Sequence, residues 1–67
     1  MSVSSVSTVV ASSTKSFQNA LEKGLDRARK TLRGIQAVEV SQERALVEMG
    51  EIKQYVVELK VIFILED

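Results

Sequence analysis

The C-terminal third of the chain carries apolar residues on both faces of what its pattern predicts to be a single β-strand. On one face the apolar residues follow one another without a break: Tyr55, Val57, Leu59, Val61, Phe63 and Leu65. Strict alternation of this kind is typical of a strand with one buried face. The other face is half apolar, because it holds Val56, Ile62 and Ile64. We therefore expect a protein layer against each face of this strand.

Three further elements follow from the pattern of the remaining residues. Residues 3–11 alternate small polar and β-branched side chains, which predicts a first strand. A stripe of apolar residues at steps of three and four predicts a helix from about Thr14 to Arg33, with Ser13 as its N-cap and Gly34 as its stop. A period of two then returns over residues 35–47, and a turn at residues 48–50 leads into the final strand, Glu51 to about Glu66.

These elements predict an α+β fold in the order β-α-β-β. One helix can cover one face of a three-stranded antiparallel sheet, and the whole chain, residues 1–67, forms a single domain. The first strand has high strand propensity and no charged residue to protect an edge. It should therefore be paired on both sides or covered.

The small size of the chain predicts self-association. A domain of 67 residues has a core that rarely supplies more than about 3–5 kcal/mol. The sequence has no Cys and no His, which excludes disulfides and the commonest zinc ligands. Because Val56, Ile62 and Ile64 remain uncovered by the helix, we expect a second subunit to cover them, and so a homo-oligomer.

Composition narrows the classes of function. The formal net charge is zero and no basic patch is evident, which argues against a nucleic-acid partner. The longest apolar run, residues 61–65, is far short of the roughly 20 residues that a membrane-spanning helix needs. The N-terminus lacks the pattern of a secretory signal, so a cytoplasmic location is expected. No nucleophile–base pair is evident, and we expect a binding or assembly module rather than an enzyme.

Two residue groups have both a functional and a structural interpretation. Glu39, Ser41 and Glu43 share one face of the second predicted strand, and Glu39 and Glu43 are candidate ligands for a calcium ion. The alternative is a solvated face with ion pairs to Lys53 or Arg44. Tyr55 either stacks on a planar ligand or packs as part of the core with its hydroxyl near the rim.

The whole chain resembles the dodecins in the order and spacing of short motifs. These motifs are Ser16-Phe17, Ala20, Arg27-Ala28, Thr31-Leu32, Glu39-Val40, Gly50, Tyr55, Leu59-Lys60-Val61 and Phe63-Ile64-Leu65-Glu66. The resemblance implies a sheet curled around the helix and a hollow shell of twelve subunits with cubic symmetry. It also implies a small-ligand binding or storage role, since many dodecins bind riboflavin or other flavins in pairs.

The departures from the dodecin pattern bear on the ligand. The flavin positions that the resemblance implies are Ala37, Tyr55 and Val56. Flavin-binding dodecins have a stacking Trp at the position of Ala37 and a Gln at the position of Val56. Without the aromatic ring and the amide, we expect weak or absent flavin binding. Some dodecin-like proteins that lack the Trp bind calcium instead, which keeps the calcium interpretation open. The first strand also lacks the Lys and Glu usual in dodecins.

Overall fold

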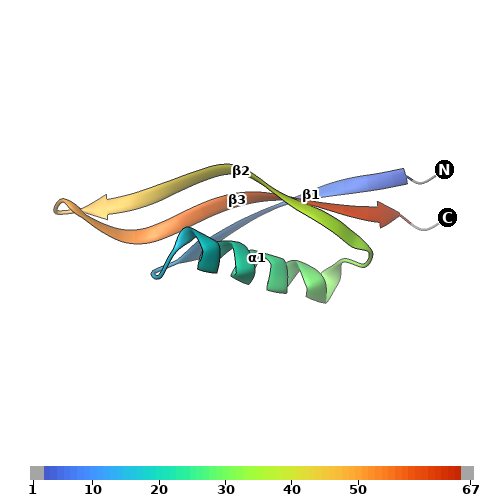
Figure 1. Ribbon diagram of the computed structural model, residues 1–67, viewed down its shortest axis with the longest axis horizontal. Coiled ribbons are helices and arrows are strands. Elements are labelled where there is room, and N and C mark those ends of the chain that lie inside the picture. The colour runs from blue at the N-terminus through green and yellow to red at the C-terminus, as the bar shows by residue number, and fades with distance from the viewer. Residues whose placement is uncertain (1–2, 66–67) are drawn as a thin grey trace.

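The computed structural model describes residues 3–65 and contains one helix and one sheet. The elements are β1 (Val3–Ser13), α1 (Phe17–Thr31), β2 (Ile35–Glu48) and β3 (Glu51–Leu65) (Figure 1). β3 lies in the centre of the sheet and pairs antiparallel with both β1 and β2. The predicted α+β fold in the order β-α-β-β is confirmed.

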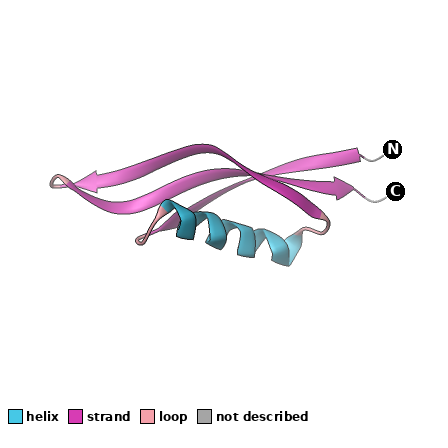
Figure 2. Cartoon of the chain, in the orientation of Figure 1, coloured by secondary structure: helices cyan, strands magenta, loops and turns pink. Residues whose placement is uncertain are grey.

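α1 covers one face of the sheet, and the core lies between the two (Figure 2). On β3 the buried side chains are Val57, Leu59 and Val61, which are the alternating positions that the sequence assigned to one buried face. Ala20 of α1 packs in one cluster with Val57 and Leu59, and Ala28 of α1 is also buried. Small residues on the helix bring its backbone close to the sheet, so a chain with few aromatic residues still buries its central strand.

Gly24 marks the closest approach between helix and sheet. A Cβ atom at this position would lie 2.6 Å from Cδ1 of Leu59 and 3.2 Å from Cβ of Ala11. The first distance is too short for two carbon atoms, so a larger residue here would have to displace Leu59 or move the helix away from the sheet. The helix thereby accepts a residue that disfavours helix formation by about 1 kcal/mol relative to alanine.

The helix begins later than the sequence predicted, because Ser13 belongs to the strand. Ser13 pairs with Tyr55 as the last residue of β1, and its hydroxyl donates to Oδ1 of Asn19 and accepts from the backbone N–H of Lys15. The N-cap is Ser16, whose hydroxyl accepts from the backbone N–H of Asn19 at 2.9 Å. Ser13 was therefore the wrong N-cap: its hydroxyl bonds to the Asn19 side chain and the Lys15 N–H, and accepts from no backbone N–H of the first turn of α1.

The connections of the second half depend on positive φ angles. Met49 and Gly50 both have positive φ, which is the conformation of a two-residue hairpin turn, and they join β2 to β3. Gly34 also has positive φ, but α1 ends earlier than predicted, at Thr31 with Leu32 as C-cap. The predicted end of the last strand, Glu66, lies outside the described residues.

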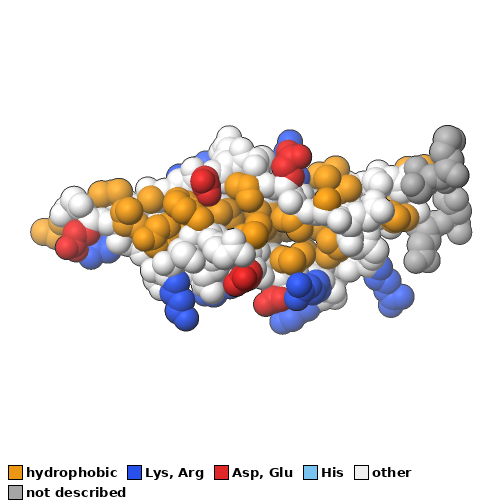
Figure 3. All heavy atoms as spheres, in the orientation of Figure 1, with side chains coloured by type: hydrophobic (Ala, Val, Ile, Leu, Met, Phe, Trp, Pro, Cys, Tyr) orange, Lys and Arg blue, Asp and Glu red, His pale blue; other side chains and the backbone are white. Residues whose placement is uncertain are grey.

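The face of the sheet opposite α1 has no covering layer among the described residues. We call it the bare face; it includes Val6 and Val10 of β1, Ala37 of β2, and Val56, Ile62 and Ile64 of β3. Val6 and Val10 are 55% and 65% exposed, and the three β3 residues are half-buried. Figure 3, in which α1 lies below the strands as in Figure 1, shows hydrophobic side chains in a band along the middle of the molecule that reaches the hairpin end, and several Lys and Arg side chains projecting below it.

Candidate functional site

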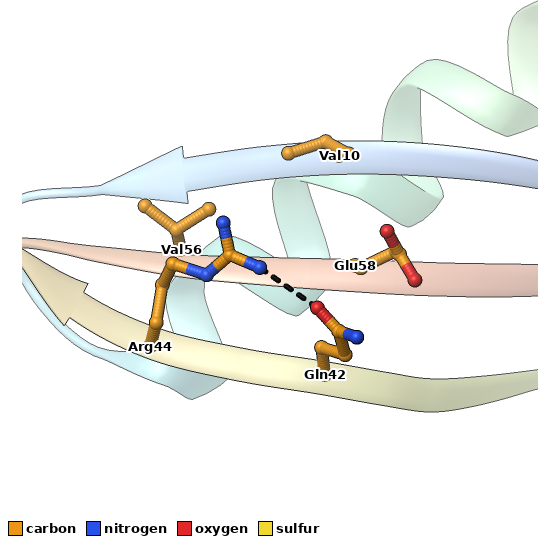
Figure 4. A pocket seen from close by; sticks show the side chains of 5 residues that line it. All are labelled: Val10, Gln42, Arg44, Val56 and Glu58. Carbon is orange, nitrogen blue, oxygen red and sulfur yellow. Dashed lines mark hydrogen bonds between the residues drawn. The ribbon is translucent and has the colours of Figure 1, made fainter.

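A shallow hollow lies on the bare face, at the middle of the three strands. Five residues line it: Val10 of β1, Gln42 and Arg44 of β2, and Val56 and Glu58 of β3. The pairing of the strands places them together, because Glu58 lies opposite both Val10 and Gln42, and Val56 lies opposite Arg44. Figure 4 shows the five side chains on the viewer's side of the sheet, with α1 behind it.

Hydrogen bonds hold the polar side chains of this hollow. The guanidinium of Arg44 donates from Nη2 to Oε1 of Gln42 at 2.7 Å (Figure 4). The carboxylate of Glu58 accepts from the hydroxyl of Ser41 at 2.8 Å, and the same hydroxyl lies 3.1 Å from the Glu58 carbonyl oxygen. The remaining N–H groups of Arg44 are available to an acceptor. The hollow therefore offers a cation, a carboxylate and an amide beside two valines, a set that suits ligand binding better than catalysis.

A β-bulge at Ser41 changes the direction of the acidic side chains on β2. The pairing with β3 moves from Val40–Leu59 to Gln42–Glu58, so Ser41 is an extra residue between them. Glu39 therefore lies opposite Lys60 on the bare face, while Glu43 lies opposite Val57 on the face of α1. The prediction that Glu39, Ser41 and Glu43 share one face is wrong, because it assumed unbroken alternation.

This arrangement leaves the two predicted calcium ligands apart within one chain. Across residues 3–65, no group of three or more Asp, Glu, His or Cys side chains is gathered closely enough to hold a metal ion. The alternative partners do not pair with Glu39 or Glu43 either: Lys53 contacts Glu51 at 3.3 Å, and Arg44 bonds to Gln42. A site that uses both glutamates needs carboxylates from more than one copy of the chain.

The three positions that correspond to the flavin site are also separated. Ala37 lies opposite Ile62, six residues along β3 from Val56, which is about 20 Å at the rise of a strand. Val56 lines the hollow, but Ala37 does not. Tyr55 points to the opposite face, where its ring packs edge-on against Phe17 with centroids 5.0 Å apart. This contact favours the structural interpretation of Tyr55, which stays a prediction.

Sequence reasoning missed the hollow because it missed the bulge. Gln42 and Glu58 were not singled out, and Arg44 was considered only as an ion-pair partner. The sequence carried no clear signal of the bulge, because Val40 is followed by apolar residues at both an odd step, Ala45, and an even step, Leu46.

Within residues 3–65, the helix is neither long nor apolar enough to cross a membrane.

Comparison with known proteins gives one family. The family model described as Dodecin matches residues 3–66. A crystal structure of a Thermus thermophilus protein is 34% identical, with a TM-score of 0.93 over 100% of this chain and 98% of the other. A dodecin from Streptomyces coelicolor is 33% identical, with a TM-score of 0.91 over 98% of this chain and 94% of the other. No curated protein matches the chain.

A more distant structural relative is described by its ligand. It is a calcium dodecin from Mycobacterium tuberculosis, described as calcium-chelating with a novel calcium-binding site. It is 26% identical to this chain, with a TM-score of 0.81 over 96% of this chain and 91% of the other.

Proposed function

Because the chain belongs to the dodecin family, we propose that it assembles into a closed shell of twelve identical subunits with a small-ligand binding or storage role. The observation that carries this proposal is the bare face. Val6, Val10 and Ile62 lie on a surface of the sheet that no element of residues 3–65 covers. Charged residues such as Glu39 and Lys60 share this surface, but apolar side chains of all three strands lie on it without a covering layer, and other copies are the natural cover.

The mass of the particle in solution tests the assembly. Light scattering on the purified chain should give twelve copies of a 7.4-kDa subunit, about 89 kDa, because a closed shell has a fixed copy number. The measurement is repeated after tenfold dilution, as a control against concentration-driven aggregation. A 7.4-kDa particle with a stable fold would contradict the proposal.

The ligand of the shell is not a tightly bound flavin under this proposal. Ala37 offers no ring to stack on isoalloxazine, and Val56 offers no amide to its polar edge. Riboflavin fluorescence should therefore change little when micromolar protein is added. The matched gain-of-function variant is Ala37→Trp with Val56→Gln, which restores both groups and should quench the fluorescence. Strong quenching by the unaltered chain would contradict this part of the proposal.

Calcium is the second candidate, and the calcium dodecin among the structural relatives is the observation that favours it. The proposed ligands are Glu39 and Glu43, with the site completed by carboxylates of neighbouring subunits, because the two residues lie on opposite faces of one sheet. Calorimetry with calcium chloride should give heat that disappears in Glu39→Gln and in Glu43→Gln. Arg44→Gln serves as a control that changes a charge on the same strand. No heat from the unaltered chain would exclude the site.

A further inference from the structure

β1 ends the sheet with an open edge. It pairs with β3 over its whole length, from Val3 opposite Leu65 to Ser13 opposite Tyr55, without a shift of register. On its other side no strand of the described residues pairs with it. The backbone N–H and C=O groups on that side form a regular row, and another extended strand is the partner that can bond to all of them.

The two edges of the sheet differ in their protection. β2, the other edge, is interrupted by bulges and carries several charged side chains, namely Glu39, Glu43, Arg44 and Glu48. Bulges and charges are the features that keep an edge strand from pairing with another chain. β1 has neither: its eleven residues include no charged side chain, no proline and no bulge. An edge left this open is expected to be paired in the native particle.

We propose that β1 pairs antiparallel with β1 of a second copy across a twofold axis that passes beside Thr8. The inference rests on the proposed assembly and names a surface through which two copies join. A strand that spans Val3–Ser13 overlaps a second copy of itself completely only when Thr8 lies opposite Thr8 of the second copy. The two sheets then form one continuous sheet of six strands, with the protected β2 strands at its outer edges.

The side chains of the bare face support this register. When Thr8 lies on the axis, Val6 of each copy lies opposite Val10 of the other. These two valines are 55% and 65% exposed in the single chain, and the pairing places each against the other. Cross-strand pairs of β-branched residues, here Val–Val and Thr–Thr, are among the favourable pairs in antiparallel sheets. The register that gives the longest strand overlap is thus also the one that pairs the exposed valines.

A single cysteine tests the axis directly, because the chain has no native cysteine. In Thr8→Cys the two sulfur atoms meet across the axis, since directly opposed residues have Cα atoms about 4.5–5.5 Å apart and disulfides need about 4.4–6.8 Å. A glutathione redox buffer should convert this variant to a covalent dimer, seen on a non-reducing gel. The matched control is Ser12→Cys, an exposed residue on the same face of β1. Its two copies lie about 26 Å apart in the proposed register and should remain unlinked.

A second variant tests the register of the two β1 strands with cysteines that lie away from the twofold axis. Ser4→Cys combined with Ser12→Cys puts the two cysteines of different copies opposite each other and should form covalent dimers, while each single variant should not. A particle of full mass with no cross-link in Thr8→Cys or in the double variant would overturn the β1 pairing and leave the shell intact. Equal cross-linking of Thr8→Cys and Ser12→Cys would overturn it too. A monomeric chain would instead contradict the proposed function itself.

Discussion

The two faces of β3 show how far one helix can stabilise a sheet. On the face of α1, Val57, Leu59 and Val61 are at most 1% exposed. On the bare face, their neighbours Val56 and Ile62 are only half-buried. Both sets of residues are equally apolar and belong to the same strand. The difference is therefore one of layers: residues 3–65 supply a covering layer for one face of the sheet and none for the other.

The largest effect is expected on the covered face. Leu59 is fully buried and touches the closest turn of α1. Leu59→Ala should lower the free energy of unfolding by about 2–5 kcal/mol, because it removes buried methyl groups and leaves a cavity. Urea unfolding at one fixed protein concentration measures this change. Met49→Ala, at a fully exposed turn position, is the control and should be nearly neutral. A loss below about 1 kcal/mol for Leu59→Ala would mean that the core is placed wrongly.

On the bare face the expected effect is on assembly. Ile62 lies between Val6 and Ala37, with no charged residue directly opposite it. Ile62→Lys should remove the oligomer from the light-scattering profile. Burying an unpaired ammonium group between subunits costs on the order of several kcal/mol. Gln18→Lys adds the same charge to an exposed position of α1 and should keep the native mass. An Ile62→Lys particle of native mass would show that this face is solvated in the assembly.

A smaller effect is expected where α1 meets the sheet. Gly24→Ala adds one methyl group at a point where Cβ would lie 2.6 Å from Leu59. Overpacking costs about 1–3 kcal/mol, and the better helix propensity of alanine returns about 1 kcal/mol. The melting temperature should therefore fall by several degrees. Lys23→Ala, the exposed neighbour on the same helix, should leave it nearly unchanged. A more stable Gly24→Ala variant would mean that the helix can move away from the sheet without loss.

The smallest effect is expected at the start of α1. Ser16→Ala removes the hydroxyl that accepts from the N–H of Asn19 and should cost about 1 kcal/mol. Ser12→Ala, an exposed strand residue, is the control for the loss of a serine hydroxyl. Urea midpoints of the two variants measure the difference. Equal midpoints would show that Ser16 does not cap the helix in solution.

The covered face was predictable from the sequence, and the details of β2 were not. Unbroken alternation on β3 identified Val57, Leu59 and Val61 as one buried face, since a period of two has a single interpretation on a strand. The bulge at Ser41 could not be placed in the same way, because one extra residue redirects every later side chain. Glu39 and Glu43 were therefore predicted on one face and lie on two.

The candidate site was predictable only in part, for a similar reason. Family positions identify Ala37 and Val56 one residue at a time, but they do not say whether one chain brings them together. The register of β2 on β3 shows that it does not.

The start of the helix gives a further example: three of the residues 12–16 are serines, and each is a good N-cap by residue type. Pairing of Ser13 with β3, a long-range contact, decided which serine caps the helix.

Thermal unfolding at a series of protein concentrations tests the central claim, that copies of the chain complete each other's folded state by covering the bare face. If folding is coupled to assembly, the melting temperature rises with concentration, because mass action favours the associated state. We expect this rise together with a single cooperative transition. A melting temperature that stays constant over a hundredfold range, for a particle of 7.4 kDa, would contradict the account.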